Sequence, residues 1–408
     1  MECVGEMKKL ISIILIIMMI LGAVACNSTK SNESKEEVKE TEKKTDSDTD
    51  GEEVKETEKK TDSDTDGEEV ERKPFKIGFS VWGTSDSHGR YVSQAASWVE
   101  ELGGEVIVDV AQGFTIDAQV ASIENLIQSG ADIVSFCAYS GEAVIPKISE
   151  LAEKNEVYFV MWDTTVSDPA IQEMVDSNPY FVGTTNEGQF EAGYETVEYL
   201  AEQGATDFVI IKYAIGVAIC DERVDGASKA IDDLGLNLTY VIEVPEDTKK
   251  AVEDTLVNYP EVNAVVAVGG TAMYVTPSIQ AIESVGRKGE VLTSGFDFSD
   301  TMGAELEAGD LSLVLGGHVV TTHFANLMAL SAYWGDPINP DKEQLMIPYL
   351  TVTSPEDIDN FNKYVVGDVP PYTPEEMLDS ISSDKTFDDF QKIAMEYSIE
   401  DVISRRGE

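Results

Sequence analysis

The sequence predicts an α/β protein in which two lobes are each built on a parallel sheet. A strand–loop–helix–strand unit opens the series at Phe75–Ala111, and such a unit buries its strands only between helices in a parallel sheet. Apolar β-rich runs and amphipathic helical stretches then alternate as far as Val352. More than ten strands are expected, which is many for one open sheet, so two sheets and therefore two lobes are predicted.

The opening unit illustrates how each element is assigned. An apolar run at Lys76–Val81 predicts the first strand, and Trp82–Gly89 is a polar loop. A helix follows, because apolar residues recur at helical spacing, namely Tyr91, Ala95, Trp98 and Leu102. Gly103 ends this helix, and Val106–Val110 forms the second strand. Ligands of such sheets bind at the carboxyl ends of the strands, so the loop Trp82–Gly89 is a candidate for ligand contact.

The same reasoning assigns the remaining elements. Further strands are predicted at Asp132–Ala138, Val157–Asp163, Tyr180–Thr185, Asp207–Ile215, Leu238–Val244, Ala264–Val268, Val291–Phe296, Leu311–Leu315 and Tyr349–Val352. Helices are predicted at Asp117–Gly130, Ala143–Asn155, Glu191–Gln203, Arg223–Leu234, Lys249–Tyr259, Pro277–Val285, Thr301–Ala308 and Thr321–Trp334. The alternation weakens beyond Thr353, where only two short helices are predicted, at Glu375–Leu378 and Phe387–Tyr397.

The N-terminal residues 1–25 are typical of a secretory signal. Two lysines precede an apolar run of 16 residues, Leu10–Ala25, and small residues lead up to Cys26. Residues 23–26 read AVAC and resemble a bacterial lipobox, which implies cleavage before Cys26 and a diacylglycerol on its sulfur. An uncleaved transmembrane anchor is the alternative, but 16 residues are few for a span of the bilayer.

Residues 26–72 have the composition of a disordered acidic tether. The sixteen residues Glu36–Gly51, EEVKETEKKTDSDTDG, recur without change at Glu52–Gly67. The segment contains no aromatic side chain and almost no apolar ones, so nothing offsets the entropy lost on ordering. A solvated spacer between lipid and folded domain is therefore predicted, and a tail that binds a partner is the alternative.

The charge and the cysteines narrow the classes of function. The chain carries a net charge of −48, and residues 73–408 alone hold 57 acidic and 18 basic residues. Such a surface repels nucleic acid and anionic lipid, so nucleic acid is excluded as a partner and a salt-tolerant extracellular surface is expected. Cys137 and Cys220 are predicted to be buried thiols rather than a bridge. No Cys or His pair has metal-ligand spacing, so neither a metal nor a cofactor is predicted.

Seven stretches carry a resemblance to a known family. They are KIGFSV at 76–81, GAD at 130–132, VMWD at 160–163, YFVGTTNEGQFEAG at 180–193, ERVDGASKAI at 222–231, VLTSGFD at 291–297 and LSLVLGGH at 311–318. In this order and spacing they resemble the type I periplasmic binding proteins of the ribose-binding kind, the solute-binding components of ABC importers. The resemblance implies two Rossmann-like lobes, joined by hinge crossings, that close on a ligand. No DNA-binding helix pair is predicted before Lys73, so a repressor of the same fold is not expected.

The resemblance also implies how the chain divides between the lobes. Residues 73–186 and 318–340 are expected to form the N-terminal lobe, and residues 187–317 and 341–360 the C-terminal lobe. Residues 361–408 are expected to be a C-terminal helical extension. Three hinge crossings are predicted, near residues 185–186, near Asp297 and near residues 317–318.

The resemblance places three charged residues in the ligand site: Asp163 after the fourth strand, Arg223 in the segment RVDG, and Asp297 after Gly-Phe. Carboxylates accept ligand hydroxyls and the guanidinium donates to them, while Trp82 and Trp162 could cover an apolar ring face. Asp86, His88, Arg90 and His318 complete the candidates. Each has a structural alternative: a loop cap for Asp163, an exposed helix residue for Arg223, a turn residue for Asp297, and core positions for the two tryptophans.

The sequence departs from the ribose-binding pattern at several places. Thr164 stands where that subset usually has Arg, and Gly269-Gly270-Thr271 where it has Asn or Asp. Gly317-His318 stands at the last crossing where Gln is usual. Another sugar or a small polar signal molecule is therefore expected in place of ribose.

The predicted function is capture of a small polar solute, most simply a sugar, at the outer face of the cell membrane, and its delivery to an ABC permease. The protein is expected to be a monomer that the lipid on Cys26 anchors. A receptor that reports to a sensor kinase or chemoreceptor is the alternative, since it would share fold and site. No catalytic residue is predicted, because no G-x-S-x-G motif and no carboxylate pair set to activate water is found.

Overall fold

The computed structural model describes residues 72–84, 87–213, 217–367 and 369–407. The predicted signal, the lipidated Cys26, the tether up to residue 71 and the candidate Asp86 lie outside the described residues. Across the described ranges there is no helix that is both long and apolar enough to cross a membrane.

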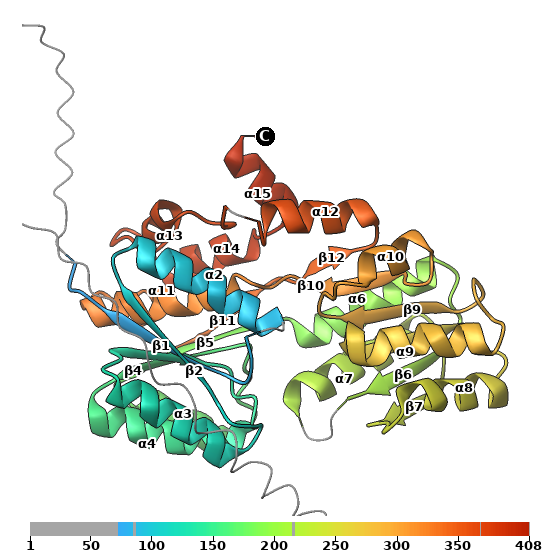
Figure 1. The fold of residues 1–408 in the computed structure, drawn as a ribbon, viewed down its shortest axis with the longest axis horizontal. Helices are drawn as coiled ribbons and strands as arrows, with labels where there is room; N and C mark the ends of the chain where they lie inside the picture. Colours follow the sequence, from blue (N-terminus) through green and yellow to red (C-terminus); the bar gives the residue numbers. More distant parts are fainter. Residues whose placement is uncertain (1–71, 85–86, 214–216, 368, 408) are drawn as a thin grey trace, which may run out of the picture. The chain divides into compact units, whose positions relative to one another are not determined.

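The first lobe is a six-stranded parallel sheet with helices on both faces (Figure 1). Its strands are β1 (Lys76–Val81), β2 (Glu105–Val110), β3 (Ile133–Phe136), β4 (Tyr158–Trp162), β5 (Phe181–Glu187) and β11 (Gln344–Ile347), in the order β11-β5-β4-β3-β1-β2. Its helices are α2 (Ser87–Glu101), α3 (Ile116–Gln128), α4 (Ile145–Asn155), preceded by the short turn η1 (Glu142–Val144), α5 (Pro169–Ser177) and α11 (Thr321–Trp334). One apolar core lies under α2 and α11, and a second lies under α3 and α4.

The second lobe repeats this plan. Its strands are β6 (Asp207–Lys212), β7 (Asn237–Glu243), β8 (Ala264–Gly270), β9 (Leu292–Phe296), β10 (Leu313–Gly316) and β12 (Leu350–Val352), in the order β12-β10-β9-β8-β6-β7. Its helices are α6 (Gln189–Glu202), α7 (Ala218–Asp233), α8 (Thr248–Asn258), α9 (Thr271–Ser284) and α10 (Met302–Glu307). Only β12 runs antiparallel to its neighbour. The predicted α/β class with two sheets is therefore confirmed, and the two sheets share one strand order.

The chain crosses between the two sheets at three places, of which two were predicted. The first follows β5 at Gly188, and the second follows β10 at Gly317. The prediction of a crossing at Asp297 is wrong, because this residue joins β9 to α10 and both pack in the second lobe. The third crossing instead passes through Tyr349, between β11 and β12.

The lobe boundary after residue 340 needs a second correction. Gln344–Ile347 pairs in parallel with Thr184–Glu187 of β5, so β11 is the edge strand of the first sheet. The prediction that residues 341–360 all belong to the C-terminal lobe is therefore wrong for β11. The change of sheet occurs only between Ile347 and Leu350, where two residues connect β11 to β12.

The C-terminal residues form four helices rather than two. They are α12 (Pro355–Tyr364), α13 (Pro374–Ser380), α14 (Phe387–Met395) and α15 (Ile399–Arg406). Ser354, Thr373 and Thr386 begin the first three with capping boxes, in which side chains satisfy the open backbone N–H groups. Their buried side chains join the core of the first lobe.

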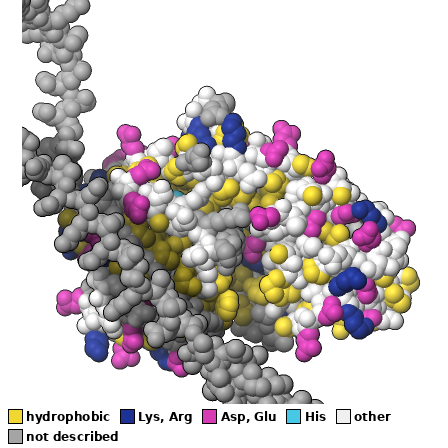
Figure 2. Space-filling view, in the orientation of Figure 1, with side chains coloured by type: hydrophobic (Ala, Val, Ile, Leu, Met, Phe, Trp, Pro, Cys, Tyr) yellow, Lys and Arg dark blue, Asp and Glu magenta, His cyan; other side chains and the backbone are white. Residues whose placement is uncertain are grey.

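The two cysteines of the described chain are buried, as predicted. Cys137 follows β3 in the first lobe, Cys220 lies on α7 in the second, and no disulfide joins these two described residues. Figure 2 shows that acidic side chains are scattered over the visible face and do not gather in one patch. This distribution agrees with a solvated acidic surface better than with a dedicated cation-binding face.

His323 is a buried histidine that makes folding sensitive to acid. Its side chain is fully buried on α11, stacked on Trp98 at 5.8 Å between ring centroids, and Nδ1 lies 3.3 Å from the carbonyl oxygen of Val319. Burial lowers the pKa of His323 to about 4, from 6.5 in solution. Between about pH 4 and pH 6.5, His323 is protonated in the unfolded chain but not in the folded protein. The free energy of unfolding therefore rises with pH across this window and falls as the pH is lowered through it.

We expect His323→Leu to remove this sensitivity. At about pH 5 the unprotonated histidine should cost the wild type about 2 kcal/mol of unfolding free energy relative to pH 8, because only the unfolded chain is protonated there. Urea unfolding of both proteins at the two pH values measures the difference. Equal pH dependence in wild type and variant would show that His323 does not control it.

Candidate functional site

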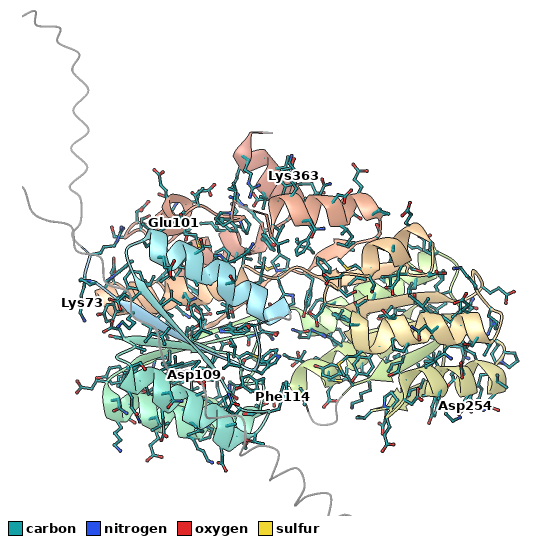
Figure 3. All side chains as sticks on the ribbon, in the orientation of Figure 1. Lys73, Glu101, Asp109, Phe114, Asp254 and Lys363 are labelled. Carbon is teal, nitrogen blue, oxygen red and sulfur yellow. The ribbon has the colours of Figure 1, made fainter. Side chains whose placement is uncertain are left out.

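A cavity of about 630 Å³ lies at the carboxyl ends of the strands of both lobes. The first lobe contributes residues that follow β1, β2 and β4, and the second contributes α7 and the ends of β6, β8 and β9. Its lining consists of Trp82, Phe114, Asp163, Tyr213, Ile219, Arg223, Gly269 to Tyr274, Asp297 to Asp300 and His318. Figure 3 shows Phe114 on the first lobe, at the ends of its strands. The volume is in the range of small-molecule sites, about 300–1,000 Å³.

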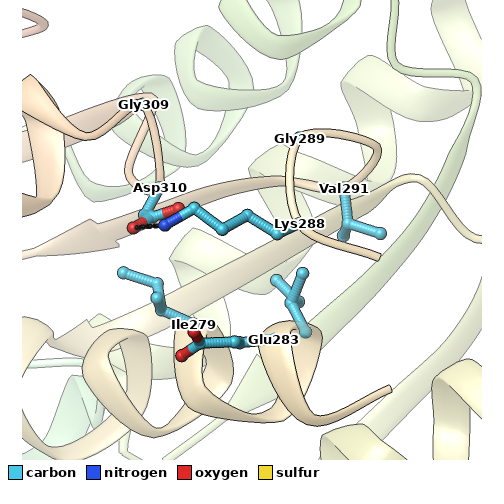
Figure 4. Close-up of a pocket in the computed structure, with 8 residues that line it drawn as sticks. Ile279, Glu283, Lys288, Gly289, Val291, Gly309 and Asp310 are labelled. Atoms are coloured by element: carbon cyan, nitrogen blue, oxygen red, sulfur yellow. Dashed lines mark hydrogen bonds and ion pairs between the residues drawn. The ribbon is translucent and has the colours of Figure 1, made fainter. Parts of the chain in front are cut away.

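A smaller hollow in the second lobe does not suit a solute. It lies beside α9 and the turn that carries Lys288, whose Nζ is 2.7 Å from Asp310 (Figure 4). Its volume is about 10 Å³, which is room for about one water molecule. The large cavity is the candidate site because it lies at the carboxyl ends of the strands, where sheets of this kind bind ligands.

Two aspartates occupy equivalent positions in the two lobes. Asp163 follows β4 and Asp297 follows β9, and these strands hold the same place in the two sheets. Both residues have left-handed backbone, with φ of 46° and 61°. Such a conformation costs a residue with a side chain about 1–3 kcal/mol and is concentrated at functional sites. Each carboxylate thus enters the cavity from its own lobe.

Local hydrogen bonds hold both strained turns. The thiol of Cys137 donates to the carbonyl oxygen of Asp163 at 3.3 Å. The hydroxyl of Thr271 donates to the carbonyl oxygen of Asp297 at 2.6 Å, and the N–H of Asp297 donates to Leu315 at 2.8 Å. Neighbouring side chains and backbone groups thus hold the two turns through the main-chain atoms of the aspartates.

Arg223 lies at the centre of a buried polar network, which rules out the alternative of an exposed helix residue. It is 5% exposed. Its Nε donates to Gln189 at 2.7 Å, Nη1 to the carbonyl oxygen of Val268 at 3.0 Å, and Nη2 to the hydroxyl of Tyr349 at 2.6 Å. The guanidinium also lies 4.0 Å from the ring centroid of Phe296. The network joins the second lobe to the first and third crossings.

Two glycines allow this arrangement. A Cβ at Gly193 of α6 would lie 2.1 Å from the carbonyl oxygen of Arg223, and one at Gly226 of α7 would lie 1.9 Å from that of Phe190. Atoms cannot approach this closely, so only glycine lets the two helices pack backbone to backbone. The close packing sets Arg223 beside Gln189, which begins α6.

A second group of titratable side chains lies beside this network. Asp163, Glu187 and His318 each offer a ligand-type atom, and these atoms lie within 4.8 Å of one another. Glu187 ends β5 and is 1% exposed, and Gln189 donates to its Oε2 at 3.3 Å. Burial raises the pKa of Glu187 well above its usual value, and the nearby Asp163 raises it further, although Arg223 acts in the opposite sense.

The structure brings five of the predicted site residues to the cavity and leaves one in the core. Trp82, Asp163, Arg223, Asp297 and His318 all line it. Trp162 is fully buried in the core of the first lobe, because as the last residue of β4 it points into the sheet's apolar layer, so the core alternative holds for it. His88 and Arg90 belong to α2, but their side chains lie outside what the structure describes.

Sequence reasoning predicted Trp82 but missed the other aromatic residues that line the cavity, Phe114, Tyr213 and Tyr274. On the first lobe Trp82, Phe114 and Tyr139 form a group with ring centroids 5.0–6.0 Å apart. On the second lobe Tyr213 and Tyr274 lie 6.4 Å apart. Phe114 is 65% exposed, which is unusual for a large apolar side chain unless a ligand or partner covers it. A large aromatic residue in the loop just after a strand is the signal that could have identified Phe114 and Tyr213, whereas Tyr274 lies within α9.

Comparisons with known proteins agree with the fold. The family described as periplasmic binding protein domain matches residues 77–324. No curated protein sequence matches the chain.

Solved structures of solute-binding proteins share the fold at low identity. A periplasmic ribose ABC transporter protein from Conexibacter woesei is 16% identical with a TM-score of 0.61, over 71% of this chain and 95% of that chain. A solute-binding protein from Actinobacillus succinogenes with bound D-allose is 20% identical with a TM-score of 0.60, over 71% and 100%. One from Bacillus halodurans with bound myo-inositol is 19% identical with a TM-score of 0.56, over 70% and 96%.

Proposed function

The chain belongs to the periplasmic binding protein domain family, as the resemblance predicted, and on this premise we propose that it captures a sugar or a similar polyol outside the cytoplasm. The observation that carries the proposal is the pair of equivalent aspartates, Asp163 and Asp297, which reach one cavity from two lobes. A solute between them can satisfy both carboxylates only when the lobes hold it together.

The chemistry of the lining suits a polyol. Each carboxylate can accept hydrogen bonds from two hydroxyls. The aromatic groups at Trp82 and at Tyr213 offer apolar faces for the C–H side of a sugar ring. Ligands in related folds, including D-allose and myo-inositol, are polyols of this kind. Nothing in this proposal requires turnover of the solute, so we propose a binding protein and not an enzyme.

We propose delivery to an ABC permease as the physiological role, with the protein acting as a monomer. The family and the solved structures described as ABC transporter proteins support it. A receptor for a sensor kinase or chemoreceptor uses the same site and differs only in its partner. A thermal-shift screen of the purified chain against sugars, polyols, amino acids and nucleosides identifies the ligand class, because a ligand of the folded state raises the melting temperature. A response to amino acids or nucleosides alone would contradict the proposed polyol.

Asp297→Asn and Asp163→Asn are expected to weaken binding of the identified solute by about tenfold to a few hundredfold each. Charged hydrogen bonds in a closed cavity contribute roughly 1.5–3 kcal/mol. Isothermal titration calorimetry measures the affinity, and Asp254→Asn on the exposed face of α8 is the matched control. Normal affinity in both site variants would place the solute elsewhere.

We further propose that the protein is anchored to the outer face of the cell membrane through Cys26. The support is the apolar run that ends in residues 23–26, AVAC. Mass spectrometry of the membrane-extracted protein is expected to find Cys26 as the acylated first residue. A mature chain that begins at another residue would contradict the anchor.

A further inference from the structure

We propose that Asp163, Glu187 and His318 form a site for a divalent transition-metal cation, with zinc as the best fit, on the floor of the solute cavity. The inference rests on the proposed function only in taking this cavity as the solute site. It goes beyond that function because it assigns a ligand of a different chemical class.

The first support is the convergence of three separate segments. Asp163 comes from the end of β4, Glu187 from the end of β5, and His318 from the crossing that follows β10. Their ligand-type atoms lie within 4.8 Å of one another. Since the residues are far apart in the sequence, no spacing motif could reveal them, and the sequence alone predicts no metal.

The second support is the state of Glu187. Its side chain is 1% exposed, and no donor in the part of the chain that the structure describes reaches its Oε1, while the neighbouring group that interacts with the carboxyl, Asp163, is itself a carboxylate. A buried carboxylate oxygen without a donor is costly, and native structures rarely keep one without a reason. Arg223 does not supply the donor, because its Nε, Nη1 and Nη2 point to Gln189, Val268 and Tyr349. A cation beside Glu187 would satisfy this oxygen.

The ligand types favour zinc over calcium or magnesium. One imidazole nitrogen and two carboxylate oxygens form a set that Zn²⁺ binds well, whereas Ca²⁺ and Mg²⁺ prefer oxygen ligands alone. Tetrahedral zinc with bonds of about 2.1 Å holds its ligand atoms about 3.4 Å apart. The present atoms, within 4.8 Å of one another, need to approach by about 1 Å, which side-chain rotation can supply.

The residues around the triad are also those expected of a metal site that keeps one coordination position open for a ligand. Gln189 donates to Glu187 Oε2 at 3.3 Å, which orients the carboxylate as outer hydrogen bonds do in metal sites. Asp163 and His318 line the cavity, so the fourth position of the cation would face the solute. A hydroxyl or carboxylate oxygen of the solute could then bind the cation directly.

The test measures the cation alone, without any solute. The full chain is purified, freed of metal with a chelator that is then removed, and titrated with zinc chloride by calorimetry. We expect one saturable equivalent above the weak binding of the acidic tether. Glu187→Gln and His318→Ala are expected to weaken this equivalent at least a hundredfold, while Asp297→Asn, a lining residue outside the triad, keeps it.

Two further measurements keep the result interpretable. Far-ultraviolet circular dichroism shows whether each variant folds, and cobalt(II) added to the wild type reports ligation through its visible absorption without any substitution. The proposal is overturned if the wild type has no saturable site, if cobalt gives no spectrum of bound ion, or if folded Glu187→Gln and His318→Ala bind zinc normally. Zinc binding without any response to polyols would contradict the proposed solute and leave the cation site standing. Polyol binding by a protein that binds no cation would contradict the cation site and leave the proposed solute standing.

Discussion

Arg223→Met is expected to weaken solute binding by roughly a hundredfold and to lower the free energy of unfolding by about 3 kcal/mol. Arg223 lines the cavity, so its removal takes away a charged donor that contributes roughly 1.5–3 kcal/mol to a bound polar group. It also takes a charged donor from Gln189, Val268 and Tyr349, and only the mutual hydrogen bond from the Tyr349 hydroxyl to Gln189 Oε1, at 2.9 Å, remains in its place. The loss of three charge-assisted hydrogen bonds in a buried network accounts for the loss of stability.

The control for this variant is Arg287→Met in the same lobe. Arg287 pairs with the exposed Glu290 at 3.3 Å and does not line the cavity, so its removal should cost at most about 1 kcal/mol and leave affinity unchanged. Arg223→Lys should not rescue binding, because one ammonium group cannot reproduce the fork that reaches three partners. Calorimetry gives the affinity and urea unfolding gives the stability. Normal affinity with reduced stability would restrict Arg223 to a structural role.

The two sheets could be predicted because their strands carry a strong local signal. Parallel strands are buried on both faces, so they appear as apolar runs such as Phe208–Ile211, and the helices between them have one apolar face. The order of the strands was not predicted, since alternation alone does not specify which strands are neighbours. The equal strand order of the two lobes became visible only in the structure.

The elements that escaped prediction are short or depend on distant partners. β11 has four residues, QLMI, and it is a strand because β5 offers it an open edge. α12 has few apolar residues, so its period is weak, although the capping box of Ser354 and Asp357 was readable in the sequence. The prediction of a crossing at Asp297 was wrong because no local feature of the sequence distinguishes a turn within a lobe from a crossing between lobes.

Site residues could be predicted where a charged side chain stands at the end of a strand. They could not be predicted where the role of a residue depends on whether its side chain is buried. Asp163 and Asp297 stand at the ends of apolar strands, so strand assignment already placed them at the ligand-binding edge. Glu187 stands at a similar strand end, but in a chain with 77 acidic residues one buried glutamate has no distinguishing local feature. Trp162 shows the converse, since an aromatic residue beside a site residue can face the core.

The C-terminal helices are not an appendage: α13, α14 and α15 belong to the first lobe, and α12 also packs on the second lobe, where Ile358 joins its core and Phe361 lies 4.5 Å from Phe298 between ring centroids. Phe390 of α14 is fully buried, with its ring centroid 5.2 Å from that of Phe324 on α11. Gln391 forms two hydrogen bonds with the backbone of Met346, at 2.8 and 2.9 Å, so α14 also covers the open edge of β11. Tyr397 donates to the carbonyl oxygen of Gly317 at 2.8 Å, which ties the same region to the second crossing.

Phe390→Ala is therefore expected to lower the free energy of unfolding by about 4 kcal/mol, because it removes a fully buried ring and leaves a cavity in the core of the first lobe. Met395→Ala is the control on the same helix, since Met395 is 51% exposed and its loss should cost less than about 0.5 kcal/mol. Urea unfolding, followed by tryptophan fluorescence, measures both. Solute affinity should stay unchanged in each variant, because neither residue lines the cavity. A small loss for Phe390→Ala would mean that the C-terminal helices fold apart from the lobe, and a single cooperative transition at much lower urea concentration would show that they fold with it.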